Sequence, residues 1–101
     1  MIAKLTAGER KTALKELGKW KAARKGEAIQ RSFKFKNFSE AWGFMARVAL
    51  LADSQDHHPE WFNVWNQVRI DLATHDAVGI TSLDVELARS METLAARLPQ
   101  K

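Results

Sequence analysis

The sequence contains no cysteine. That absence excludes disulfide bonds, thiolate catalysis, and zinc or iron–sulfur sites built from cysteine. Nothing in the chain approaches the roughly 18 consecutive apolar residues of a membrane-spanning helix. The first residues also lack the apolar stretch of a secretory signal peptide. We therefore predict a cytoplasmic protein that does not enter a membrane.

Internal repeats, low-complexity tracts and linkers are absent as well. A chain of 101 residues can bury one modest core, so we predict that residues 1–101 form a single domain. Chains of this size often bury further apolar surface by oligomerisation.

Acidic residues are scarce in the first third of the chain. Residues 1–36 contain 11 Lys and Arg against 3 Asp and Glu, whereas residues 37–101 contain 5 against 9. A basic segment can attract nucleic acid or another anionic partner. Because no zinc-finger or aromatic–basic strand pattern accompanies the charge, we interpret this segment as a solvated, lysine-rich surface. Nucleic-acid binding remains an alternative that rests on charge alone.

Three segments have the periodicity and the boundary residues of α-helices. Thr6–Glu9 is a capping box that opens a short helix, and Gly18 ends it. Ser39 is a favourable N-cap for a helix that runs to about Gln55. A second capping box, Thr81–Asp84, precedes apolar residues at spacings of three and four, which predicts an amphipathic last helix.

Two pairs of short segments have the alternation of β-hairpins. They are Trp20–Lys25 with Ala28–Lys36, and Trp61–Trp65 with Val68–Ala73. We place the first turn at Gly26 and the second at Asn66-Gln67, because asparagine tolerates the positive φ of tight turns. Arg31 falls on the apolar side of its strand and is the exception to the alternation. The predicted fold is a two-layer α+β domain: a four-stranded antiparallel sheet with three helices on one face, in the order α-β-β-α-β-β-α.

The predicted helix from Ser39 to Gln55 is apolar around much of its circumference. Phe44, Leu50 and Leu51 widen its apolar stripe well beyond one face. A helix of this kind is usually buried on two sides. In so small a chain the second side can be another subunit, so we predict a homo-oligomer.

All three histidines, His57, His58 and His75, lie within nineteen residues of one another. Pro59 favours an extended conformation for His58. Successive extended residues point their side chains in opposite directions. We therefore expect one histidine of the pair to line a pocket while the other supports it. The second hairpin brings residues near 60 opposite residues near 73, so His75 should return to the neighbourhood of the pair.

Several chemistries compete for this cluster. The histidines could hold a metal together with Asp56, Glu60 or Asp76, although adjacent histidines diverge and no His-x-His or His-x-x-x-His spacing occurs. A serine hydrolase would need a Gly-x-Ser-x-Gly elbow, which is absent. Histidines that only hydrogen-bond within a loop are a third option. We favour general acid–base catalysis without metal or cofactor, in which one imidazolium donates a proton and one imidazole accepts one.

At these residues the sequence resembles pterin-4a-carbinolamine dehydratases, whose animal members also serve as dimerisation cofactors of a hepatocyte nuclear factor. The resemblance covers roughly residues 10–98. Trp65 stands where many members have tyrosine, and the first hairpin is about one residue longer than in animal members. The matching segments are Asp56–Val64, Thr74–Asp76, Gly79 and Asp84, preceded by Phe33–Phe38, Ala41 and Phe44–Ala49.

The resemblance implies loss of water from a 4a-hydroxytetrahydropterin in tetrahydrobiopterin recycling, with histidines as acid and base and no cofactor. It assigns catalysis to His57, His58 and His75. Asp84 matches the last position of the family motif as a supporting residue, although a purely helix-capping role explains it equally well. The segments that would bind the pterin contain Asp56, His57, His58, Ala73, Thr74, His75 and Asp76.

The resemblance also implies partners. Members are commonly homodimers or homotetramers, and a phenylalanine hydroxylase can accompany them in the pathway. The alternative function is that of an oligomerisation partner, or coactivator, of a transcriptional regulator.

Overall fold

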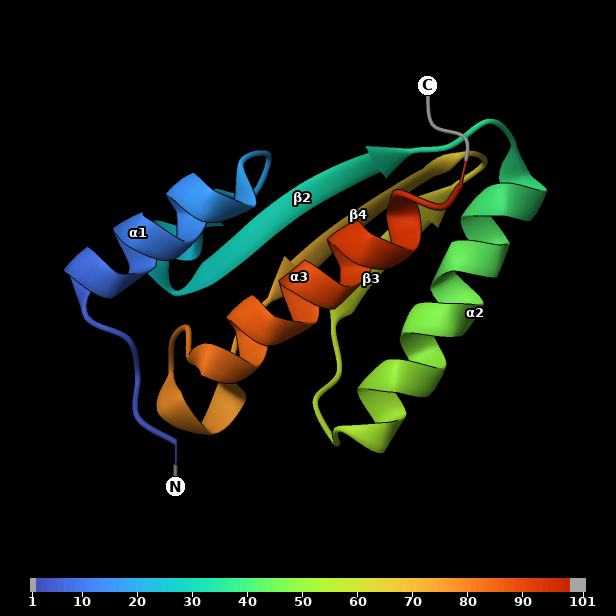
Figure 1. Ribbon diagram of the computed structural model, residues 1–101. Helices are drawn as coiled ribbons and strands as arrows, with labels where there is room; N and C mark the ends of the chain where they lie inside the picture. The colour runs from blue at the N-terminus through green and yellow to red at the C-terminus, as the bar shows by residue number, and fades with distance from the viewer. Residues whose placement is uncertain (1, 99–101) are drawn as a thin grey trace.

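Three helices and four strands follow one another in the predicted order in the computed structural model, which describes residues 2–98. Two short 3₁₀ turns, η1 and η2, complete the fold (Figure 1). The helices are α1 (Ala7–Leu17), α2 (Phe38–Ser54) and α3 (Ser82–Ala95); the strands are β1 (Lys21–Ala23), β2 (Ala28–Lys34), β3 (Glu60–Val64) and β4 (Gln67–Leu72); the turns are η1 (Arg24–Gly26) and η2 (His75–Ala77).

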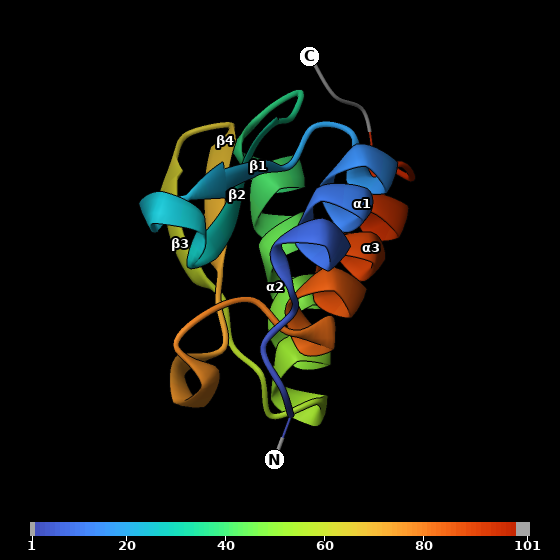
Figure 2. The same ribbon diagram turned by 90° about the vertical axis from the view of Figure 1, so that its left-hand side faces the viewer.

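The four strands form one antiparallel sheet in the order β1-β2-β4-β3. Figure 2 shows the sheet nearly edge-on, with all three helices on one side of it. This arrangement confirms the predicted two-layer α+β fold. No helix in the described part of the chain is both long enough and apolar enough to cross a membrane.

Local hydrogen bonds explain where the helices begin. Both predicted capping boxes are present, at Thr6 with Glu9 and at Thr81 with Asp84. The prediction for the middle helix was wrong by two residues, because its N-cap is Asn37 and not Ser39. The Asn37 side chain accepts a hydrogen bond from the backbone N–H of Glu40 at 2.9 Å, which satisfies one of the free donors of the first turn.

The first hairpin is shorter than predicted. β1 ends at Ala23, and the residues before β2 form the turn η1. Arg24, Lys25 and Gly26 all have positive φ, at 51°, 56° and 88°. Only the glycine adopts such a conformation without steric cost.

The second turn was also predicted one residue too late. Val64 pairs with Gln67, so Trp65 and Asn66 are the two turn residues, and Trp65 has the positive φ of 48°. Asn66 is instead fully buried, and its side-chain amide donates to the Phe35 carbonyl at 2.8 Å. The backbone N–H of Phe35 donates to the Asn66 carbonyl at the same distance. These two bonds tie the hairpin turn to the end of β2.

The core lies between the sheet and the helices, and aromatic rings form its centre. Phe33, Phe35 and Phe44 pack against one another with ring centroids 4.9 to 5.9 Å apart. Arg31 shares the buried side of β2, with its guanidinium 3.9 Å above the Phe33 ring and paired with the Glu92 carboxylate of α3. The buried and exposed residues of β2 therefore alternate as predicted. The ion pair with Glu92 allows the charged Arg31 to lie on the buried side.

Apolar side chains remain exposed on the outer side of α2. Phe38, Trp42 and Leu50 expose 50%, 59% and 75% of their surface. The Phe38 and Trp42 rings stack with centroids 6.5 Å apart. Exposed apolar patches of this kind mark interaction sites more often than isolated apolar residues do. Oligomerisation through α2 remains a prediction.

Candidate active site

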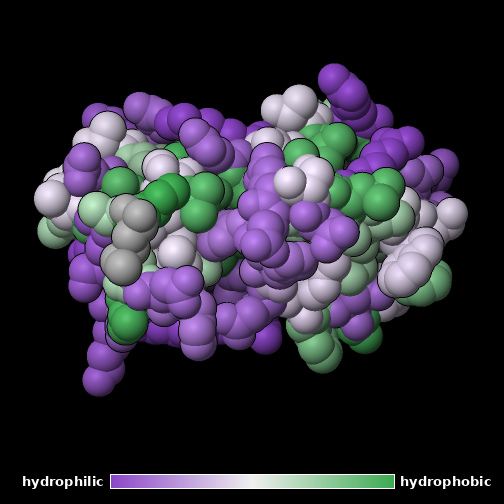
Figure 3. Space-filling view, turned by 90° about the horizontal axis from the view of Figure 1, so that it is seen from below, coloured by the Kyte–Doolittle hydropathy of each residue, from purple (hydrophilic) through white to green (hydrophobic). Residues whose placement is uncertain are grey.

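A hollow of about 330 Å³ lies at one end of the molecule, between the segment that links α2 to β3 and the segment that follows β4. Both segments run at the lower end of the fold in Figures 1 and 2. Seen from this end, hydrophilic side chains gather between more hydrophobic regions (Figure 3). The lining residues are Asp56, His57, His58, Ala73, Thr74, His75, Asp76 and Leu83.

The end of α2 directs the first two histidines. Asp56 follows the helix with a φ of 50°, which turns the chain sharply. The backbone N–H of His57 then donates to the Ala52 carbonyl at 3.0 Å, satisfying one of the free acceptors at the helix end. The side chain of His57 is buried, whereas that of His58 is exposed.

His57 is held by a buried carboxylate. Its Nε2 lies 2.6 Å from Oδ1 of Asp84, and the Asp84 side chain is fully buried. A carboxylate only accepts hydrogen bonds, so Nε2 carries a proton in this contact. The other ring nitrogen, Nδ1, is then the atom of His57 that can accept or donate a proton.

Asp84 joins three segments of the chain. Its Oδ2 accepts hydrogen bonds from the Thr74 hydroxyl at 2.8 Å and from the backbone N–H of Thr81 at 2.9 Å. Thr74 immediately precedes His75, and Thr81 caps α3. Asp84 is therefore both a capping residue and the link between His57 and the His75 segment. A buried carboxylate is stable only when it is hydrogen-bonded in this way.

His58 points to a different partner. Its Nε2 lies 3.3 Å from Oδ1 of Asp53 in the last turn of α2, and both side chains are mostly exposed. An exposed contact of this length contributes little to stability. The two adjacent histidines thus contact carboxylates of different helices.

His75 begins η2 on the opposite wall of the hollow. It is exposed, and a bridge between Thr74 and Gly79 closes the loop that carries it. His75 also lines a neighbouring hollow of about 250 Å³, together with Arg24 and Glu27. His75 also affects the pKa of Glu60. Hydrogen bonding to Arg24 lowers the pKa of Glu60, burial opposes that shift, and the positive charges of Arg24 and His75 add to it.

The seven residues that we expected on the pterin-binding segments line the hollow together. Asp84 lies behind His57 and not on the wall itself. Two residues of the site were not predicted from the sequence: Leu83, which lines the hollow, and Asp53, which contacts His58. The sequence contained one signal for Asp53, because this residue lies in the last turn of the helix that directly precedes the histidine pair. Among residues 2–98 no group of three or more His, Asp or Glu side chains is arranged to hold a metal ion.

Comparisons with known proteins identify one family of related sequences. A family model described as pterin 4 alpha carbinolamine dehydratase matches residues 3–94. Proteins named for that enzyme from Rhodopseudomonas palustris (strain BisB18) and Bradyrhizobium sp. (strain ORS 278) are 55% and 52% identical over 98 residues. The matched residues make up 97% of this chain in both comparisons, and 97% and 98% of the two relatives, respectively.

Two solved structures are similar as well. A crystal structure from Brucella melitensis, described as a transcriptional coactivator/pterin dehydratase, is 52% identical with a TM-score of 0.89, covering 91% of this chain and 98% of that one. A pterin dehydratase-like protein, identified as a RuBisCO assembly factor in the alpha-carboxysome, is 19% identical with a TM-score of 0.66 over 75% of this chain and 88% of its own. The second likeness concerns the fold alone.

Proposed function

Because this chain belongs to the pterin 4 alpha carbinolamine dehydratase family and is a dehydratase, we propose that it converts a 4a-hydroxytetrahydropterin into the quinonoid dihydropterin during tetrahydrobiopterin recycling. The observation that carries the proposal is the hollow with His57 and His58 on one wall and His75 on the other. Imidazole groups can both donate and accept protons near neutral pH.

The reaction needs one acid and one base. The C4a–O bond breaks as an acid protonates the departing hydroxyl group, which leaves as water. The lone pair of N5 forms the new double bond to C4a, and a base removes the proton from N5. Atoms and electrons balance without an external oxidant or reductant, so two histidines suffice.

We assign the two proton transfers to His57 and His75. Asp84 fixes the orientation and tautomer of His57, because Oδ1 accepts a hydrogen bond from the Nε2–H group at 2.6 Å. It also stabilises the imidazolium that forms when Nδ1 takes up a proton, as the buried carboxylate of a catalytic triad does for its histidine. His58, which is exposed beside Asp53, binds and orients the substrate.

The test is the turnover of a chemically generated carbinolamine by His57→Ala, His58→Ala and His75→Ala. General acid–base groups contribute about 10²- to 10⁴-fold. We expect losses in that range for His57 and His75, and a smaller loss for His58. The assignment is wrong if no variant loses more than about 10-fold. Lys11→Ala, which changes an exposed side chain of α1, is the control and should retain full turnover.

A second candidate function is that of an oligomerisation partner for a transcriptional regulator. The Brucella melitensis protein is described as both a coactivator and a pterin dehydratase, and the exposed apolar residues of α2 could serve such a role here. Turnover by the purified chain would separate the two, because a pure interaction module has no need of the histidine-lined hollow.

A further inference from the structure

Arg24 joins the two strands that lead to and from the histidine-lined hollow. Its Nη1 and Nη2 donate to the two carboxylate oxygens of Glu60, each at 2.8 Å, and Nη2 also donates to Oδ2 of Asp71 at 3.1 Å. Glu60 begins β3 two residues after His58, and Asp71 lies in β4 four residues before His75. One guanidinium therefore contacts both strands close to the hollow.

The two carboxylates need such a cation. Glu60 and Asp71 are directly opposite each other in the β3–β4 ladder, and like charges in opposite positions destabilise a strand pair. Arg24 replaces this repulsion by two attractions, and the Gln30 amide donates to the second oxygen of Asp71 at 2.9 Å. A planar guanidinium fits a carboxylate with two parallel hydrogen bonds, which a lysine cannot reproduce.

The backbone that presents Arg24 is strained. Arg24 and Lys25 have φ values of 51° and 56°, a left-handed conformation that is sterically unfavourable for residues other than glycine. Strain of this kind persists only where the surrounding structure holds it, and it is concentrated at functional sites. The contacts of Arg24 with Glu60 and Asp71 are side-chain interactions that hold η1 in place against the sheet.

Arg24 is also close to His75. Both residues line the neighbouring hollow of about 250 Å³, and the charges of both act on Glu60. We propose that Arg24 is a positioning residue: by bridging Glu60 and Asp71 it fixes the separation between the wall that carries His57 and His58 and the wall that carries His75. This proposal rests on the proposed function, in which His57 and His75 act on one substrate.

The first experiment compares Arg24→Ala and Arg24→Lys with the wild-type enzyme in carbinolamine turnover. Displacements of about 1 Å can cost 10²-fold in rate, so we expect kcat to fall at least about 10-fold in the alanine variant, with KM changed less than about 3-fold. The lysine variant should recover only part of the loss, because it keeps the charge and loses the bidentate contact.

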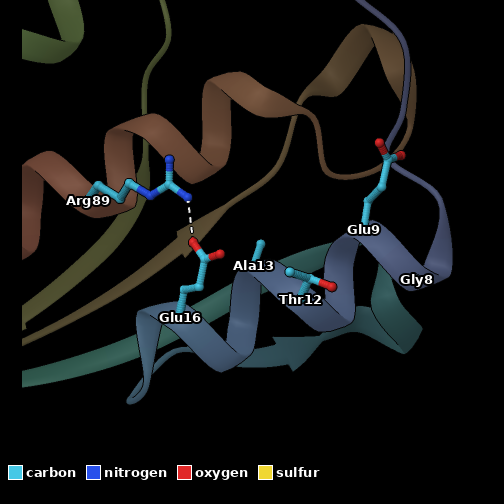
Figure 4. Close-up of a pocket in the computed structure, with 6 residues that line it drawn as sticks. All are labelled: Gly8, Glu9, Thr12, Ala13, Glu16 and Arg89. Atoms are coloured by element: carbon cyan, nitrogen blue, oxygen red, sulfur yellow. Dashed lines mark hydrogen bonds and ion pairs between the residues drawn. The ribbon is translucent and has the colours of Figure 1, made fainter.

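A matched control removes a similar ion pair whose residues do not line the hollow. Arg89 of α3 donates to Glu16 of α1 at 2.8 Å, and both side chains are about half exposed, as Arg24 is (Figure 4). Arg89→Ala should leave turnover unchanged. Equal losses of turnover in Arg24→Ala and Arg89→Ala would overturn the proposal.

The second experiment asks whether Arg24 acts through the two carboxylates. In the Glu60→Gln/Asp71→Asn background, Arg24→Ala should change kcat by less than about 2-fold, because the charges that it bridges are gone. A full 10-fold loss in that background would show that Arg24 acts by another route, which would overturn the proposal.

A third measurement is independent of turnover. Amide hydrogen exchange of residues 73–77 reports local opening of the His75 segment. We expect faster exchange there in Arg24→Ala and not in Arg89→Ala, and unchanged exchange would exclude the bridge as a constraint. If the wild-type enzyme itself shows no turnover, the proposed function fails and the catalytic part of this proposal fails with it, whereas the exchange result still decides whether Arg24 holds the two walls together.

Discussion

His57 and Asp84 meet at 2.6 Å between Nε2 and Oδ1, although 27 residues separate them in the sequence. The contact is buried, and the same carboxylate reaches the segment of His75 through Thr74. One buried side chain thereby sets the orientation of one histidine and the position of another.

Replacing Asp84 by asparagine should therefore impair turnover more than folding. The carboxamide oxygen of the Asp84→Asn variant can still accept from Thr74 and Thr81, but its amide nitrogen would face Nε2 of His57 and force the other tautomer. The analogous change in a serine protease triad costs about 10⁴-fold in kcat, and we expect at least about 10²-fold here. Turnover and the urea midpoint should be measured together. A variant that keeps a third of wild-type turnover would contradict the role of Asp84.

The ion pair of Arg31 with Glu92 should be important for stability. Glu92 also accepts from the Trp20 indole N–H at 2.9 Å, so Glu92→Ala leaves a buried guanidinium and a buried indole without their acceptor. Breaking a buried pair costs roughly 3 to 5 kcal/mol. Because Glu92 is one-third exposed, we expect about 2 to 3 kcal/mol in urea unfolding. Glu86→Ala, at an exposed position of the same helix, should change stability by less than about 0.5 kcal/mol.

The lowered pKa of Glu60 predicts a pH-dependent contribution to stability. Hydrogen bonding to Arg24 is its main cause. A carboxyl group whose pKa is lower in the folded state stabilises the fold above its unfolded pKa, and this contribution is lost as the pH falls through the folded value. Glu60→Gln should therefore lower the urea midpoint at pH 7, and this effect should shrink as the pH falls through the lowered pKa of Glu60. An effect that stays constant across the acidic range would contradict an electrostatic origin.

The exposed apolar side of α2 predicts self-association. Trp42 is 59% exposed and stacks on Phe38, so Trp42→Lys should shift an oligomer towards monomer in sedimentation at micromolar concentration without lowering the helix content. Lys36→Ala, which removes an exposed charge before α2, is the control. A wild-type chain that sediments as a monomer would remove this prediction altogether.

Short-range patterns in the sequence were sufficient for the order of the helices and strands. Both capping boxes join residues three positions apart, and the alternation in β2 placed Ile29, Arg31 and Phe33 on one side, as the structure has them. Two of the boundaries that were wrong, at Asn37 and at Trp65-Asn66, lie where neighbouring residues are each suited to the same role, as N-cap or as turn residue. Asn66 forms a long-range bond to Phe35, so the turn falls where that bond can form.

Residue types and their local spacing were enough to predict the α+β fold, the family resemblance and the set of histidines. The carboxylate that each histidine contacts, Asp84 for His57 and Asp53 for His58, depends on the tertiary fold. So does the bridge from Arg24 to Glu60 and Asp71. Such partners are set by the order of strands in the sheet and by the packing of α3 beneath the hollow. Contacts between residues 27 or 47 positions apart leave no periodic signal in the sequence.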